Sequence, residues 1–193
     1  MEDQKKIGDA IGGDGSVNST YKGNATGGDH SANRTYEGNA SGKNRSANCT
    51  YKGNATSKYG SANCTYKGNA IGENCSANRT SIGDAIGKYG SANRTSIGNA
   101  SGENNSANCT YKGNATGKYG SANYTFEGNA SGEDCSVALT RWGHAKVGDK
   151  SLAMGTSVKI GKNSVGVVLD YSGEIKEITL SVPKSKTVKV KYV

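Results

Sequence analysis

The chain repeats with a period of 15 residues, and this period constrains the fold more than any other feature. Serine recurs at every fifteenth position from Ser16 to Ser151, and Gly, Ala and Thr keep the same spacing at their own positions. The register runs from about Ile7 to Lys150 without a slip. Fifteen residues are too few for a pair of helices and suit one coil of a β-solenoid. We therefore predict an all-β chain built of parallel, in-register strands.

The composition supports ordered repeats despite a small number of large apolar residues. The 193 residues include 29 Gly but only 1 Pro. Disordered low-complexity segments are usually richer in Pro and have no register. Glycine placed at fixed positions of a period instead indicates a backbone that must turn or pack closely at those positions.

The invariant positions of each coil predict which side chains face inward. In the segment that begins at Ser46, the positions of Ser46, Asn48 and Thr50 hardly change between coils, whereas the residue between Asn and Thr varies among Arg, Cys and Tyr. Gly53 and Ala55 are similarly fixed. Alternate residues of a strand face opposite sides, so two short strands per coil would enclose a narrow, partly polar interior. We expect the Asn side chains of successive coils to hydrogen-bond to one another.

Alternate turns carry a Lys-Tyr-Gly sequence, and the turns between them carry Glu. Stacked coils would place these Lys and Glu side chains next to each other, which favours the correct register. Aromatic faces also stack on sugar rings, and exposed turns leave them free to do so. The candidate ligand-contact residues are therefore Lys58, Lys88, Lys118, Tyr59, Tyr89 and Tyr119.

A second aromatic column lies at the end of the longer predicted strand. Stacked tyrosines stabilise a solenoid without any ligand, and the column is interrupted at Ser81 and Ser96. We therefore favour a structural role for it, and carbohydrate binding through its tyrosines is the alternative. Its members are Tyr21, Tyr36, Tyr51, Tyr66, Tyr111 and Phe126.

Charge and cysteine content exclude several functional classes. The net charge of +8 is spread over the chain with acidic neighbours, so we predict no nucleic-acid partner. No apolar run of membrane-spanning length and no signal peptide occur, which predicts synthesis in the cytoplasm and no membrane span. The 5 Cys are expected to be free thiols. His30 and His144 lack ligating neighbours, and no catalytic set is visible, so we predict neither an enzyme nor a metal or other cofactor.

The C-terminal coils carry the motif of a known family. Residues 145–155 and 161–165 roughly follow the pattern Ala-x-Gly-x-x-Ser-x-Ala-x-Gly, and earlier coils follow it with Asn for the central Ala and Thr for the last Gly. This resembles the head repeat of the YadA-like trimeric adhesins. The resemblance implies a left-handed parallel β-roll, usually trimeric, of the kind found in bacterial surface adhesins and phage tail fibres. It also implies a location on a virion or at a cell surface.

Apolar residues return at outward positions in the C-terminal part, where earlier coils have Ala, Arg and Cys. Contiguous exposed apolar residues mark a contact surface, so we predict a homo-oligomer, a trimer, formed through this part. The candidate interface residues are Val137, Leu139, Leu152, Met154, Val165 and Val167.

These patterns predict three regions and one general function. Residues 1–15 form an N-terminal cap and first coil, residues 16–165 form the solenoid, and residues 166–193 form a small β cap around the turn at Tyr171. We predict a non-enzymatic attachment or structural protein that recognises a cell-surface glycan or another envelope component. The alternative is a soluble solenoid that binds glycan or ice, and the inward Thr column argues against ice.

Overall fold

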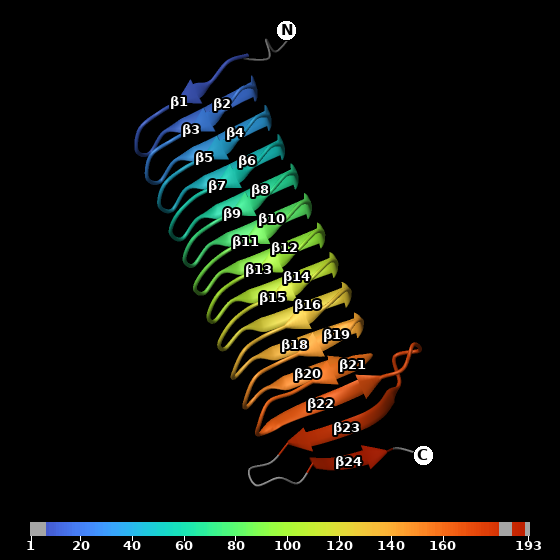
Figure 1. Ribbon diagram of the computed structural model, residues 1–193. Helices are drawn as coiled ribbons and strands as arrows, with labels where there is room; N and C mark the ends of the chain where they lie inside the picture. The colour runs from blue at the N-terminus through green and yellow to red at the C-terminus, as the bar shows by residue number, and fades with distance from the viewer. Residues whose placement is uncertain (1–6, 182–186, 192–193) are drawn as a thin grey trace.

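The computed structural model describes residues 7–181 and 187–191, which form a parallel β-solenoid (Figure 1). Each coil contributes one long and one short strand, and equivalent strands of successive coils pair in parallel. The predicted all-β solenoid of 15-residue coils is confirmed, and no helix occurs in the described residues.

The long strands form a 13-stranded sheet and the short strands an 11-stranded sheet. The larger sheet contains β2 (Val17–Lys22), β4 (Ala32–Glu37), β6 (Ala47–Lys52), β8 (Ala62–Lys67), β10 (Ala77–Ile82), β12 (Ala92–Ile97), β14 (Ala107–Lys112), β16 (Ala122–Glu127), β18 (Val137–Trp142), β20 (Leu152–Gly155), β22 (Ser164–Leu169), β23 (Ile175–Ser181) and β24 (Thr187–Lys191). The smaller sheet contains β1 (Ala10–Ile11), β3 (Ala25–Thr26), β5 (Ala40–Ser41), β7 (Ala55–Thr56), β9 (Ala70–Ile71), β11 (Ala85–Ile86), β13 (Ala100–Ser101), β15 (Ala115–Thr116), β17 (Ala130–Ser131), β19 (His144–Lys146) and β21 (Ser157–Lys159).

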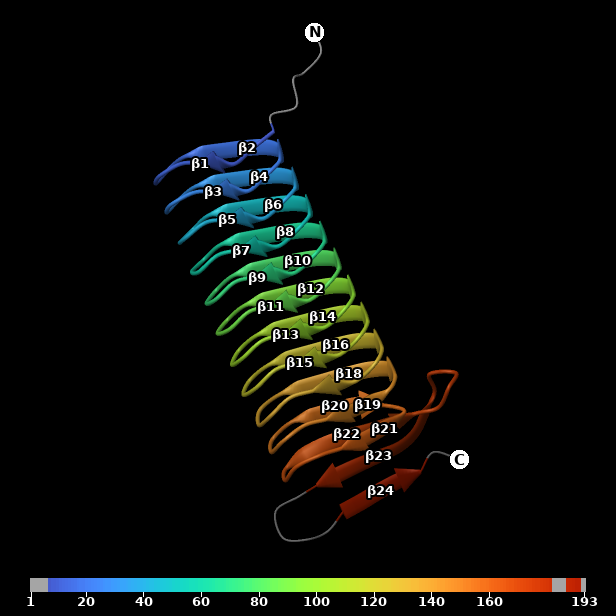
Figure 2. The same cartoon turned by 45° about the horizontal axis from the view of Figure 1, so that its top comes forward.

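The coils stack into a straight, narrow rod with β1 at one end and β24 at the other (Figure 2). Because every coil pairs with the next through its backbone, each contacts only its two neighbours. No helix that could span a membrane is found in residues 7–181 and 187–191.

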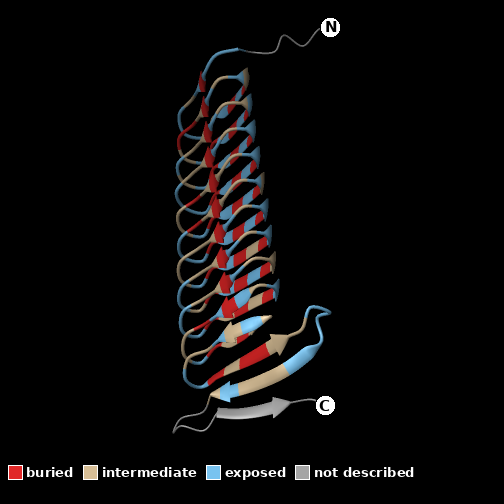
Figure 3. Cartoon of the chain, turned by 45° about the vertical axis from the view of Figure 1, so that its right-hand side comes forward, coloured by how far each residue is buried: buried red, intermediate tan, exposed pale blue. Residues whose placement is uncertain are grey.

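Burial alternates along each long strand as the sequence predicts (Figure 3). In the third coil, Ser46, Asn48 and Thr50 are buried, while the residues between them are exposed. The alanine that begins each short strand, such as Ala55, is also buried. Only small side chains fit between the two sheets, so the interior contains little of the usual large aliphatic core.

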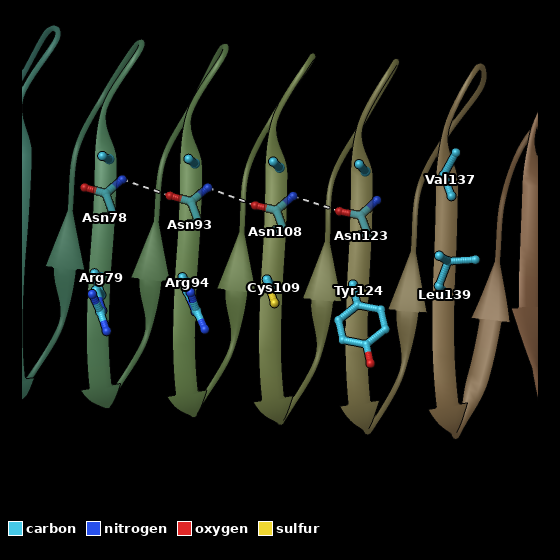
Figure 4. A pocket seen from close by; sticks show the side chains of 14 residues that line it. Asn78, Arg79, Asn93, Arg94, Asn108, Cys109, Asn123, Tyr124, Val137 and Leu139 are labelled. Atoms are coloured by element: carbon cyan, nitrogen blue, oxygen red, sulfur yellow. Dashed lines mark hydrogen bonds between the residues drawn. The ribbon is translucent and has the colours of Figure 1, made fainter. Parts of the chain in front are cut away.

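Buried Asn side chains form a continuous ladder through the interior. Each side-chain Nδ2 donates to the Oδ1 of the next Asn, and seven such bonds of 2.7–3.0 Å run from Asn18 to Asn123. Figure 4 shows part of this ladder. The ladder satisfies amide groups whose burial would otherwise be costly.

Buried Thr hydroxyls bond to the backbone of the glycine column. Thr50 Oγ1, for example, donates to the carbonyl oxygen of Gly38 at 2.9 Å. A Cβ added to Gly38 would collide with the carbonyl of Gly23, and its φ of +138° lies in a region that L-residues rarely adopt. Close approach of backbone to backbone therefore explains why glycine recurs at this position.

The parallel coils end in an antiparallel cap. β22 pairs in parallel with β20, and β23 and β24 then add antiparallel strands to the same sheet. The cap covers the edge of the last coil, which would otherwise be open to end-to-end association. The turn at Tyr171 joins β22 to β23 as predicted.

The boundaries of the solenoid differ slightly from the predicted residues 16–165. Ile7 already bridges to Lys22, and the last parallel strand continues to Leu169. The last coil is shorter, since Ser151 and Ser164 are 13 residues apart. Residues 1–6, 182–186 and 192–193 lie outside the described residues, and so do the parts of the predicted caps that fall on them.

Candidate functional site

Three columns of outward side chains run along the larger sheet. The alanine column begins at Ala32 and contains Ala as far as Ala122. The variable column lies two residues later on each strand and consists of Ser19, Arg34, Cys49, Cys64, Arg79, Arg94, Cys109 and Tyr124. The aromatic column follows after a further two residues and consists of Tyr21, Tyr36, Tyr51, Tyr66, Tyr111 and Phe126, with Ser81 and Ser96 between the two groups.

The aromatic column forms two stacked ladders. The rings from Tyr21 to Tyr66 lie 4.7–5.0 Å apart between centroids and are nearly parallel. Tyr111 and Phe126 stack in the same way at 4.9 Å. Both faces of Tyr36 and Tyr51 are therefore occupied by neighbouring rings, which agrees with a structural role for the inner rings of the longer ladder.

Two grooves follow these columns. One, of about 440 Å³, runs along the alanine column beside Arg79, Arg94, Cys109 and Tyr124 (Figure 4). The other, of about 830 Å³, lies between the variable and aromatic columns and ends at Arg79 and Ser81. A groove along parallel coils repeats its chemistry at the coil spacing of about 4.8 Å and suits an elongated ligand.

The turn tyrosines Tyr59, Tyr89 and Tyr119 lie in one column on the edge of the rod and are 50–52% exposed. They are separated by coils that carry Asn74 and Asn104 at the same place, as the backbone hydrogen bonds show. The structure thus brings the candidate tyrosines onto one edge, two coils apart. Their neighbours Lys58, Lys88 and Lys118 are also exposed.

One of these tyrosines bonds to a side chain in the turn of the following coil. The Cys135 thiol donates to the Tyr119 hydroxyl at 3.4 Å, and this bond raises the pKa of Tyr119. Tyr59 and Tyr89 have Cys75 and Asn105 in the turn of the following coil. The three turn tyrosines therefore have unequal surroundings.

The turns place Lys and Glu of successive coils next to each other, as predicted. Lys58 and Glu73 are adjacent through a backbone hydrogen bond, but their side chains form no ion pair among the described residues. The ion pairs lie instead at the ends of the long strands, where Glu37 contacts both Lys22 and Lys52.

The candidate interface residues form a contiguous apolar patch on the outer face of the C-terminal coils. Strand pairing aligns Val137 with Leu152 and Leu139 with Met154, and continues both rows into β22. The patch extends further than the sequence indicates, because β23 adds Leu180 and Ile178 to the same rows. Because β23 runs antiparallel to β22, the order of residues in the sequence does not show that Leu180 and Ile178 continue these rows.

One candidate interface residue is already covered within the chain. Val167 is only 7% exposed, since Met154 and Ile178 lie on either side of it in the sheet. The other five candidates, Val137, Leu139, Leu152, Met154 and Val165, are half-buried.

The cysteines and histidines do not gather into a chemical site within the described residues. All 5 Cys are free, and burial raises the pKa of Cys49, as does the adjacent Cys64 thiol. His30 and His144 are both exposed, although His144 begins a strand and does not lie in a turn. No group of three potential metal ligands occurs in the part of the chain that is described.

No protein family, curated protein or solved structure matches this chain. The geometry of the columns, grooves and apolar patch therefore carries the functional proposal.

Proposed function

We propose that the protein is a non-enzymatic attachment module. It would act as a rigid rod that joins two further copies through its C-terminal coils and presents repeating side chains to a surface ligand. This assignment follows the resemblance to the heads of YadA-like adhesins and to phage tail-fibre parts. It places the protein on a virion or at a cell surface.

The apolar patch is the observation that carries the proposal. The rows containing Leu139 and Met154 occupy the variable column, which holds Arg79 and Arg94 in earlier coils. Monomeric rods have no need of apolar side chains at these outward positions, and contiguous apolar rows that remain partly accessible usually mark an interface. A patch confined to one end of a rod suits copies that lie side by side, as in a fibre.

A double substitution in the variable column tests this interface. Leu139→Arg with Met154→Arg repeats at the C-terminal end the arginine pair that the chain already carries at Arg79 and Arg94. Each coil should therefore still fold, while three copies would bring six additional charges together. We expect an unchanged far-UV circular dichroism spectrum and a sedimentation mass that falls from a trimer to a monomer. A folded variant that remains a trimer would exclude the patch as the interface.

The turn tyrosines are the proposed contacts to the ligand of the module, with the adjacent lysines beside them. Replacing Tyr59, Tyr89 and Tyr119 with Ser removes three exposed rings that pack on no core residue. We expect a nearly unchanged melting temperature and reduced attachment to bacterial envelope fragments. The matched variant with Phe at all three positions keeps the ring faces and should retain attachment. Equal attachment by the Ser and Phe variants would exclude these tyrosines.

The alternative function is a soluble, monomeric solenoid that binds a glycan through the same column. Ice binding is less well supported, because the regular Thr column from Thr20 to Thr140 is buried. A monomeric mass together with tyrosine-dependent glycan binding would favour this alternative.

A further inference from the structure

The outer face changes in two adjacent coils, residues 76–105. Each of these coils has the sequence ANRTSI on its long strand, while the coils on either side both have ANCTYK. Three outward positions thus change together in both coils. The substituted residues are Arg79, Arg94, Ser81, Ser96, Ile82 and Ile97.

The Ser pair opens a gap between the two aromatic ladders. Tyr66 stacks on Tyr51 through one face, and Tyr111 stacks on Phe126. Their opposite faces look along the rod toward each other across Ser81 and Ser96. We call this space, bounded by Tyr66, Ser81, Ser96 and Tyr111, the ladder gap.

The two facing tyrosines are well separated along the rod. Tyr66 and Tyr111 are separated by three coil spacings of about 4.8 Å, or about 14 Å. A ligand ring that stacks on either free tyrosine face would lie about 4.5–7 Å from it between centroids. The facing rings are more exposed than those inside the ladder, at 42% for Tyr66 and 50% for Tyr111 against 38% for Tyr51.

Two unpaired cations lie at one side of the gap. Figure 4 shows Arg79 and Arg94 side by side on β10 and β12, with their side chains directed toward the strand ends where Ser81 and Ser96 follow. Neither guanidinium has an acidic side chain within 4.0 Å among the described residues. The groove along the aromatic column ends at Arg79 and Ser81, so it leads directly to the gap.

Two exposed isoleucines follow Ser81 and Ser96 at the ends of the strands. Ile82 and Ile97 are 40% and 52% exposed and stand in line with Lys67 and Lys112 of the flanking coils. An exposed pair of isoleucines contributes little to folding at this position.

We propose that the ladder gap binds a short acidic saccharide. One of its rings would stack on the free face of Tyr66 or Tyr111, its carboxylates would pair with Arg79 and Arg94, and its hydroxyls would bond to Ser81 and Ser96. Sugar rings present flat C–H faces to aromatic rings, and guanidinium groups bind carboxylates through paired hydrogen bonds.

The distribution of charge favours a saccharide over a nucleic acid. A single-stranded nucleic acid needs a line of cations that follows its phosphates over several nucleotides. In the variable column the two arginines are flanked by the neutral residues Cys64 and Cys109. Within the variable column the arginine pair is bounded by neutral residues on both sides, which matches a compact ligand with one or two carboxylates.

Calorimetric titration of the full-length protein with tetragalacturonate tests the site. The neutral control is the same oligomer with its carboxylates reduced to alcohols, and we expect it to bind at least about tenfold more weakly. Ser81→Tyr with Ser96→Tyr completes the ladder and should abolish binding. Ser81→Ala with Ser96→Ala keeps the gap open and should retain it. Ser101→Tyr with Ser131→Tyr adds two rings to the other sheet and serves as the matched control.

A further variant remains informative if the protein with Ser81→Tyr and Ser96→Tyr does not fold. Arg79→Gln with Arg94→Gln changes only exposed side chains and should make acidic and reduced oligomers bind equally. Absence of binding by the unmodified protein, binding that survives Ser81→Tyr with Ser96→Tyr, or tighter binding of a four-residue oligothymidylate would each overturn the proposal.

The site goes beyond the proposed attachment function and does not depend on the trimer. Sedimentation of the same samples separates the two ideas. A trimer that binds no saccharide would exclude the ladder gap as a binding site and would leave the proposed attachment module intact. A monomer that binds the saccharide would exclude the trimeric module and support the site.

Discussion

Asn63 donates a 2.8 Å hydrogen bond from its side-chain Nδ2 to the Oδ1 of Asn78, which donates in the same way to Asn93. Asn78 is buried, and its Nδ2 also bonds to the backbone carbonyl of Ile86. Each amide is therefore both donor and acceptor, and one altered residue affects two neighbours. This relationship links the period of the sequence to the stability of the rod.

Replacing Asn78 with Asp should destabilise the protein strongly. The carboxylate cannot donate to Asn93 or to Ile86, and it places a charge in the interior. We expect the free energy of unfolding to fall by about 3 kcal/mol or more, measured by denaturant titration. Asn99→Asp is the matched control, because Asp84 already fills that exposed column and accepts the same backbone bond. Similar losses in the free energy of unfolding for both variants would contradict a stabilising role of the Asn ladder.

The narrow interior predicts a large difference between two leucine substitutions in one coil. Ala85 is 0% exposed, whereas Lys88 is on the surface. Ala85→Leu should cost about 1–3 kcal/mol or more through overpacking, and Lys88→Leu should cost little. Equal melting temperatures for the two variants would show that the inner and outer faces are reversed.

Two glycines in the same coil should respond differently to substitution. A Cβ at Gly83 would meet the carbonyl of Gly68, so Gly83→Ala should melt many degrees lower. Gly90 has a φ of +61°, and Asn105 occupies the equivalent turn position one coil later with a φ of +54°. Gly90→Asn should therefore be tolerated. A Gly90→Asn variant as unstable as Gly83→Ala would argue against the close backbone packing of the glycine column.

The contribution of Glu37 should depend on pH. The hydrogen bond from Lys52, together with the charge of Lys22, lowers the pKa of Glu37. A lowered folded pKa stabilises the protein above the unfolded pKa of the carboxyl, and this stabilisation is lost as the pH falls through the folded value. Wild type should melt slightly higher than Glu37→Gln at neutral pH and equally in acid. A difference in melting temperature that persists at acidic pH would show that Glu37 stabilises the protein through packing and not through its charge.

The sequence was sufficient to predict the period, the inward columns and the cap, because each depends on residue type at a fixed spacing. Asn48 and Ala55 could be placed inside since small, invariant residues suit a narrow interior. The ion pairs could not be placed, because adjacency of Lys58 and Glu73 along the rod does not fix the directions of their side chains. The burial of Val167 also depends on β23, whose antiparallel register has no repeat to reveal it.

The ladder gap was visible in the sequence only as an interruption of the aromatic column at Ser81 and Ser96. Its interpretation required the ring stacking on both sides and the direction of Arg79 and Arg94. Aligning the 15-residue repeats shows only which positions differ between coils. Only the stacked coils show that three altered positions meet at one place on the surface.

Sedimentation equilibrium of the full-length protein tests the proposed attachment module most directly. A trimer joined through the apolar patch predicts a mass three times the 19.9 kDa of one chain, independent of concentration over a wide range. A mass of 19.9 kDa at all concentrations would contradict the proposed trimer and would show that the apolar patch does not join copies of this chain.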